Sequence, residues 1–148
     1  MSPHLSTKDT MLTAESGLTR DAVMRWAEDL YANSVDKKDA AGFAAAFAPD
    51  GWVQFGNWPR TSGRDAITGA IAQFFDGFQS LKHQSVGNWL DARTLVLEAE
   101  VTYLRHDGRT VTVPACTIFR LASATSDDGT PQARECRIYV DLAPLYAA

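Results

Sequence analysis

Apolar residues recur at helical spacing through the first half of the chain. Thr19 is suited to cap a helix N-terminus, and Asp36 is placed to cap a second, shorter helix that ends before Pro49. A third helix is predicted to begin at Ser62 or Gly63. The apolar stripe of the first helix consists of Val23, Trp26, Ala27, Leu30 and Tyr31.

The period of the pattern changes to two in the second half of the chain, which predicts strands. A short strand at 52–55 separates the second and third helices, and longer strands are expected near 81–89, 94–104, 109–121 and 133–142. Polar connectors between the long strands suit hairpins, with an Asp-Gly pair in one of them. Pro114 lies inside a predicted strand, so we expect a sheet edge or a bulge there.

These elements predict a single α+β domain over residues 19–148. About three N-terminal helices would pack in the concave face of a strongly bent mixed or antiparallel sheet, forming a cone with an internal pocket. Residues 1–18 show no periodicity and are expected to form a flexible tail.

Composition narrows the classes of partner. The chain has 148 residues, a net charge of −4 and a pI near 5.2. The chain contains no long Lys/Arg cluster of the kind that indicates nucleic-acid binding. It also contains no apolar run that approaches the roughly 20 residues needed to span a bilayer. The polar N-terminus lacks the apolar stretch of a signal peptide, so a cytoplasmic location is expected.

Motifs for metals and cofactors are also missing. The sequence contains no CxxC or HExxH spacing and no Gly-rich phosphate loop, so neither a metal nor a cofactor is expected. Cys116 and Cys136 lie inside apolar runs and are interpreted as buried reduced thiols.

Three segments carry a family resemblance. Phe47-Ala48-Pro49-Asp50-Gly51, Gly63-Arg64-Asp65-Ala66-Ile67 and Arg137-Ile138-Tyr139-Val140-Asp141 resemble the SnoaL-like branch of the nuclear transport factor 2 (cystatin-like cone) superfamily. The resemblance implies the cone fold. Because the superfamily contains cyclases, epoxide hydrolases, ketosteroid isomerases, dehydratases and non-catalytic binding domains, it does not by itself imply one reaction.

Known catalytic positions of the superfamily are replaced in this chain. By the resemblance, the strand positions that hold the isomerase base or the hydrolase water ligands match Val53 and Phe55. The charged hydrolase positions match Glu100, Thr102 and Ile138. The chain is therefore expected to be neither a standard epoxide hydrolase nor a ketosteroid isomerase.

The same register predicts which residues do chemistry. His83, Glu100 and Thr102 are the candidate catalytic residues, with His83 as base, Glu100 as its orienting carboxylate and Thr102 or Thr117 as donor. The alternative is that Glu98 and Glu100 lie on a solvated face, so that Ala99, Val101 and Tyr103 point inward. Candidate ligand-binding residues are Trp26, Val53, Phe55, Trp58, Leu81, Thr117, Ile138 and Val140.

Two functions remain open at this point. One is a cofactor-free lyase, isomerase or cyclase that acts on an apolar cyclic or carbonyl-bearing molecule. The other is a non-catalytic dimeric domain that binds a small apolar ligand. In both cases we expect a homodimer joined through the convex face of the sheet. Residues expected on that face are Val101, Tyr103, Cys116, Ile118, Arg120, Arg137 and Tyr139.

Overall fold

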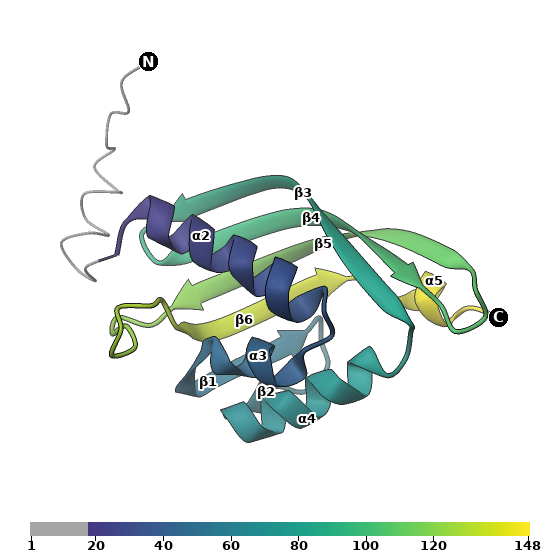
Figure 1. Cartoon of the computed structure of the whole chain (residues 1–148), viewed down its shortest axis with the longest axis horizontal. Coiled ribbons are helices and arrows are strands. Elements are labelled where there is room, and N and C mark those ends of the chain that lie inside the picture. The colour runs from purple at the N-terminus through teal and green to yellow at the C-terminus, as the bar shows by residue number, and fades with distance from the viewer. Residues whose placement is uncertain (1–17) are drawn as a thin grey trace, which may run out of the picture.

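The computed structural model describes residues 18–148, in which four helices and a π-helical turn accompany one six-stranded sheet (Figure 1). The predicted tail lies outside these residues except for Leu18, which is buried. Within the described part, no helix combines the length and apolar character needed to cross a membrane. The helical elements are α2 (Arg20–Leu30), η1 (Tyr31–Val35), α3 (Ala40–Ala45), α4 (Arg64–Phe75) and α5 (Ala143–Tyr146).

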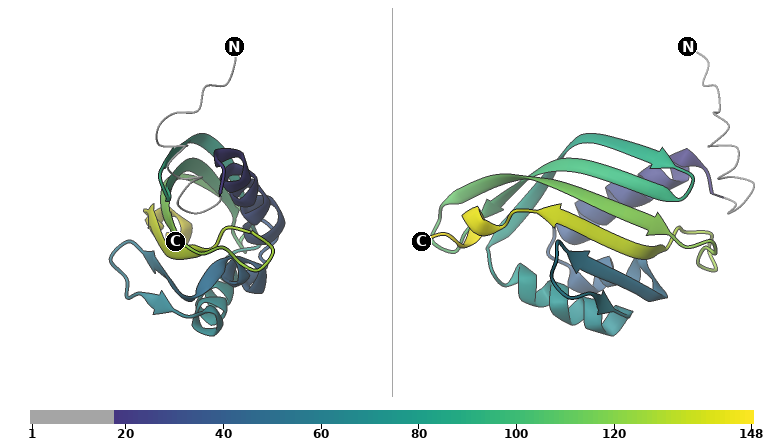
Figure 2. Two further views of the ribbon diagram at one scale, coloured as in Figure 1. Left: turned by 90° about the vertical axis from the view of Figure 1, so that its left-hand side faces the viewer. Right: turned by 180° about the vertical axis from the view of Figure 1, so that it is seen from behind.

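The sheet has the strand order β2-β1-β6-β5-β4-β3. β1 runs parallel to β6 and every other pairing is antiparallel, so the sheet is mixed as predicted. It bends around the side on which α2 and α3 lie (Figure 2). The α+β cone is therefore confirmed. The strands are β1 (Phe47–Phe55), β2 (Thr61–Ser62), β3 (Ser80–Asp91), β4 (Thr94–Leu104), β5 (Thr110–Leu121) and β6 (Ala133–Val140).

Helix α2 follows its sequence pattern closely. The Thr19 side chain accepts a hydrogen bond from the Ala22 N–H, as the predicted N-cap should. Val23 and Leu30 on the apolar face are buried. Trp26 is also buried and packs edge-on against Phe119 of β5, with ring centroids 5.3 Å apart. Trp26 is thus a core residue.

Asp36 does not cap the second helix. The cap is Asp39, whose side chain accepts the Gly42 N–H at 3.0 Å, and α3 begins at the next residue. Between them, Lys38 has a φ of 56°, which turns the chain sharply. The pattern predicted a helix here correctly but chose the wrong aspartate, and Asp36 is left available for another partner.

Strand pairing decides which face each residue occupies. His83 pairs directly with Val101, and residues directly opposite each other share a face of the sheet. Val101 and Tyr103 are buried on the concave side, which corrects their expected place on the convex face. Cys116 and Tyr139 are paired on the other face, and Tyr139 is 47% exposed, in agreement with the expectation.

Two local features of the strands bear on the candidate residues. The register between β3 and β4 shifts between Ser85 and Gly87, so that Val86 is an extra residue and the faces reverse beyond it. This turns Trp89, which is 55% exposed, to the convex face, where its ring lies against Gly87. Pro114 precedes the β5–β6 pairing, which begins at Ala115, as the sheet-edge prediction required.

The β3–β4 hairpin generates a stability prediction. Ala92 has a φ of 53°, a region that costs an L-residue about 1–2 kcal/mol. Ala92→Gly removes this strain at some cost in chain entropy, so the free energy of unfolding should rise by about 0.5–1 kcal/mol in urea titrations. As a control, Ala72→Gly on the exposed side of α4 should lower stability by about 1 kcal/mol. A loss of stability in Ala92→Gly would contradict the strain argument.

Candidate active site

A histidine–aspartate pair joins strand β3 to the turn that follows α2. The His83 Nδ1 atom lies 2.8 Å from Asp36 Oδ1, and the His83 backbone N–H donates to Asp36 Oδ2 at 3.1 Å. Both side chains are only 18% exposed. Because one carboxylate holds both the ring and the backbone of His83, the orientation of the imidazole is fixed. With Nδ1 carrying the shared proton, Nε2 is the nitrogen left to act as acceptor.

The π-helical turn presents Asp36 to the sheet. α2 widens at its end into η1, and the Asp36 N–H bonds the Tyr31 carbonyl at 2.9 Å across this wider turn. Such turns are frequent at functional sites because the extra residue re-aims the side chains around it. Here Tyr31 and Asp36, at the two ends of the turn, both face His83.

Tyr31 adds a protonated hydroxyl to this group. Its ring lies 4.7 Å from the His83 ring, between centroids, at an angle of 57°. Burial raises the pKa of the Tyr31 phenol well above its ordinary value, and a side-chain hydrogen bond with Thr117 offsets part of that effect. The phenol therefore stays protonated through the physiological range and can donate a hydrogen bond to a ligand oxygen.

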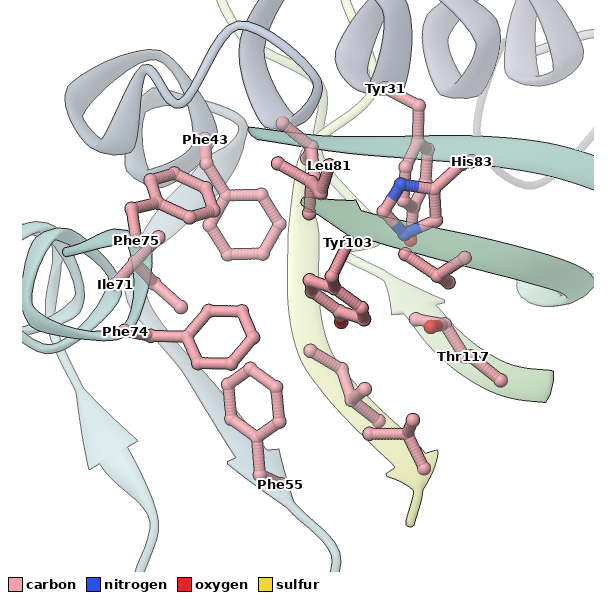
Figure 3. Close-up of a pocket in the computed structure, with 15 residues that line it drawn as sticks. Tyr31, Phe43, Phe55, Ile71, Phe74, Phe75, Leu81, His83, Tyr103 and Thr117 are labelled. Carbon is pink, nitrogen blue, oxygen red and sulfur yellow. The ribbon is translucent and has the colours of Figure 1, made fainter. Parts of the chain in front are cut away.

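These groups stand at the junction of two adjoining cavities. The inner cavity, of about 50 Å³, is lined mainly by apolar side chains, and the mouth, of about 260 Å³, is more polar. Tyr31, His83, Ala115 and Thr117 border both. Figure 3 shows Tyr31, His83 and Thr117 at one end of the inner cavity, with Phe55 and Phe74 at the other. A ligand in the inner cavity would thus have its polar contacts at one end.

The mouth is lined by several acidic side chains. Glu28, Asp36 and Glu98 are among its lining residues, and the described residues that line it include neither lysine nor arginine. Like charges at close range disfavour binding of an anion. The mouth therefore favours neutral or positively charged ligands over carboxylates and phosphates.

The expected His83–Glu100 pair is not formed. Glu100 pairs with Gln84 and Pro114, one position away from His83, and is exposed on the convex face. Thr102 is exposed on the same face, where its hydroxyl lies 2.8 Å from the Thr112 hydroxyl. The alternative with Val101 and Tyr103 pointing inward describes the molecule. The orientation predicted for Glu100 and Thr102 was wrong because the alternating pattern of β4 fits either face.

The candidate ligand-binding residues are distributed over three environments. Trp26 belongs to the core and borders neither cavity. Val53 and Trp58 border a separate hollow beside α4. The structure places the remaining candidates on the wall of the inner cavity: Phe55, Leu81, Thr117, Ile138 and Val140.

Asp36 is the residue that sequence reasoning missed. It precedes His83 by 47 positions, and its local pattern is that of a helix cap. A weak signal was available, because a second acidic cap candidate, Asp39, stands three residues later. Among residues 18–148, no group of three His, Cys, Asp or Glu side chains could hold a metal ion.

Comparison with known proteins identifies the family. The sequence model of a protein family described as "SnoaL-like domain" matches residues 27–125. The chain therefore belongs to the SnoaL-like family, and the suspected superfamily is confirmed. Comparison by sequence with curated proteins gives no match.

Solved structures agree with this fold. A protein from Jannaschia sp. CCS1 assigned as a SnoaL-like polyketide cyclase is 20% identical, with a TM-score of 0.67 over 97% of this chain and 94% of that one. ActVI-ORFA from Streptomyces coelicolor is 21% identical, with a TM-score of 0.70 over 82% and 96%. An LEH-like epoxide hydrolase from M. tuberculosis is 17% identical, with a TM-score of 0.64 over 85% and 87%. These similarities establish the fold.

The Asp36 contacts predict a stability difference between two carboxylates. Asp36→Ala leaves the His83 ring and backbone N–H without their partner in a poorly solvated place, so the free energy of unfolding should fall by about 1–3 kcal/mol. Glu100→Ala, on the exposed face, should change it by less than about 0.5 kcal/mol. Urea unfolding of both variants measures this, and equal effects would show that the Asp36 contacts contribute nothing.

Proposed function

We propose that this protein is a cofactor-free acid–base enzyme that removes a proton from carbon next to the carbonyl group of a small, apolar, neutral molecule. The observation that carries the proposal is the 2.8 Å contact between His83 Nδ1 and Asp36 Oδ1 at the edge of an apolar cavity. A histidine held in this way is a suitable general base, because the carboxylate fixes its tautomer and stabilises the imidazolium that forms.

The chemistry follows from the three side chains. His83 Nε2 accepts the proton from carbon, the C–H electron pair forms the enolate, and the negative charge moves to the carbonyl oxygen. The Tyr31 phenol is the donor to that oxygen, at the end of the cavity where Thr117 also lies. The protonated His83 then returns the proton. Return to a different carbon gives an isomerase. Protonation of a leaving group, as its bond to the β-carbon breaks and the enolate electrons form the C=C bond, gives a lyase. Attack of the enolate on a second carbonyl carbon of the same molecule, with the proton passing to the alkoxide that forms, gives a cyclase.

The substrate class follows from the lining. Apolar side chains dominate the inner cavity, whereas carboxylates border the mouth. A neutral molecule with an apolar ring or chain and a carbonyl group at one end satisfies both. The polyketide cyclase assignment of the Jannaschia protein is consistent with a substrate of this type.

A non-catalytic binding domain is the second candidate. It is favoured by the apolar residues Val53, Phe55 and Ile138 at the positions where relatives in the superfamily carry catalytic groups. In that case the cavity would hold the same neutral ligands, and His83 and Tyr31 would serve only as hydrogen-bonding groups.

We also propose that the protein is a homodimer joined through the convex face of the sheet. Trp89, Pro114, Cys116 and Tyr139 border one open hollow on that face. Trp89 and Tyr139 are half-exposed aromatic residues, a residue class enriched in interface cores. A two-fold axis would bring the same patch against itself, which is the commonest arrangement of soluble oligomers.

The catalytic proposal predicts isotope exchange. Incubated in D₂O with a panel of aryl and cyclic ketones, beginning with acetophenone and 1-tetralone, the protein should accelerate exchange of the hydrogens on the α-carbon of at least one ketone. His83→Ala should reduce this rate by about 10²- to 10⁴-fold, the usual contribution of a general base. Asp36→Asn should reduce it as well, because the carboxamide no longer stabilises the imidazolium. Mass spectrometry of the recovered ketones gives the rates.

Matched variants separate the two candidate functions. Glu100→Gln, on the outer face, should leave exchange unchanged. A folded His83→Ala protein with the wild-type exchange rate would eliminate His83 as the base. Ketones that bind the wild type without any exchange would favour the binding domain.

The dimer proposal predicts a mass of twice 16.2 kDa by light scattering at micromolar concentration. Tyr139→Glu puts a charge into the middle of the proposed interface, so it should give monomers with an unchanged circular dichroism spectrum. Tyr146→Glu is the control, because Tyr146 is similarly exposed but borders the hollow beside α4. A wild-type mass near that of one chain would refute the dimer.

A further inference from the structure

The inner cavity ends at a wall of two phenylalanines. The rings of Phe55, at the end of β1, and Phe74, on α4, lie 5.0 Å apart between centroids. Figure 3 shows them close together at the end of the cavity that is opposite Thr117. Neither ring is fully buried, although both border the cavity.

A second hollow lies immediately behind this wall. It has a volume of about 440 Å³ and is bordered by Trp58, Pro59 and Tyr146 on its outer side. Phe55, Ile71 and Phe74 border both this hollow and the inner cavity, so the two spaces adjoin at these residues. Since the inner cavity is about 50 Å³, most of the free volume at this end of the molecule lies beyond the wall.

The two rings are held with unequal firmness. Phe74 packs against Phe78 at 5.2 Å and Tyr103 at 6.4 Å, both of which are buried. Phe55 packs on its other side against Trp58 at 5.9 Å, and Trp58 is 52% exposed. Removing the Phe55 ring therefore opens the wall with the smaller loss of core packing.

We propose that Phe55, supported by Phe74, determines substrate length by closing the inner cavity against the hollow beside α4. The inference rests on the proposed function, since it takes the His83 end as the place of the carbonyl group and the Phe55 end as the place of the apolar tail. The part of the ligand that enters the inner cavity is a short tail, because about 50 Å³ accommodates only a few methylene groups, and the rest of the molecule lies in the mouth. Without the Phe55 ring, the tail extends into the hollow bordered by Trp58 and Tyr146.

A series of alkyl phenyl ketones from acetophenone to octanophenone tests this inference. Affinity is measured as displacement of the neutral fluorophore N-phenyl-1-naphthylamine, which does not require turnover. For wild-type protein, affinity should rise about fourfold per added methylene and then stop rising at a short chain length. In Phe55→Ala the rise should continue for about three further methylenes, so that the longer ketones gain about 50-fold over wild type.

Ile138→Ala is the matched control, because Ile138 borders the inner cavity but not the hollow. It widens the cavity and should change all affinities without moving the chain length at which they stop rising. Phe55→Leu retains an apolar side chain and should move that length by a smaller amount, which keeps the test available if Phe55→Ala does not fold. An unchanged limit in a folded Phe55 variant, an equal shift in Ile138→Ala, or failure of every ketone to bind overturns the inference.

The two experiments distinguish failure of the length inference from failure of the proposed catalytic function. Binding with the expected Phe55-dependent limit, but without α-carbon exchange, supports the length inference and counts against catalysis. Exchange with a length limit that does not depend on Phe55 supports catalysis and overturns the inference.

Discussion

The contact between Asp36 and His83 is the interaction on which the arrangement of the candidate site depends. It joins the turn after α2 to the first half of β3 through two hydrogen bonds to one carboxylate. Because the π-helical turn begins with Tyr31 and is followed directly by Asp36, fixing Asp36 on β3 also brings the tyrosine against the imidazole. One contact thus positions an imidazole, its carboxylate partner and a protonated phenol at the same end of a cavity.

The cavity combines two different physical environments. At the His83 end, polar groups and mouth carboxylates permit hydrogen bonding and disfavour anions. At the Phe55 end, the lining is aromatic, and the Phe55 and Phe74 rings lie 5.0 Å apart between centroids. A negative charge developing on a bound molecule at the first end would lie near the mouth carboxylates, so a hydrogen bond from the Tyr31 phenol would be needed to stabilise it.

The convex face of the sheet differs from the concave face in carrying exposed aromatic side chains. The extra residue at Val86 reverses the faces of β3, so Trp89 points outward although Leu81 and His83 point inward. The bulge therefore places Trp89 on the outer face and His83 on the inner face of the same strand, and the pairing of β3 with β4 continues beyond it. Towards the other end of the sheet, on β1, the Trp52 ring contacts the guanidinium groups of Arg60 and Arg137, which lie 3.9 Å and 4.8 Å from its centroid.

The sequence alone was sufficient for the three main helices, the four long strands and the cone fold, but it did not predict η1, β2 or α5. Helical and alternating periods are local properties, and the Thr19 cap and the strands on either side of Ala92 followed from them directly. It did not determine which face of β4 is buried, because Glu100 and Val101 occupy alternate positions of a pattern that fits a sheet either way round. Only tertiary pairing made that choice.

The partner of His83 was likewise decided by tertiary structure alone. Asp36 is 47 residues away along the chain, and its local surroundings predict a cap. No period or spacing connects two residues that meet only when a helix packs across a sheet. The length of the cavity has the same origin, because Phe55 and Phe74 come from different elements and their separation depends on how α4 packs beside β1.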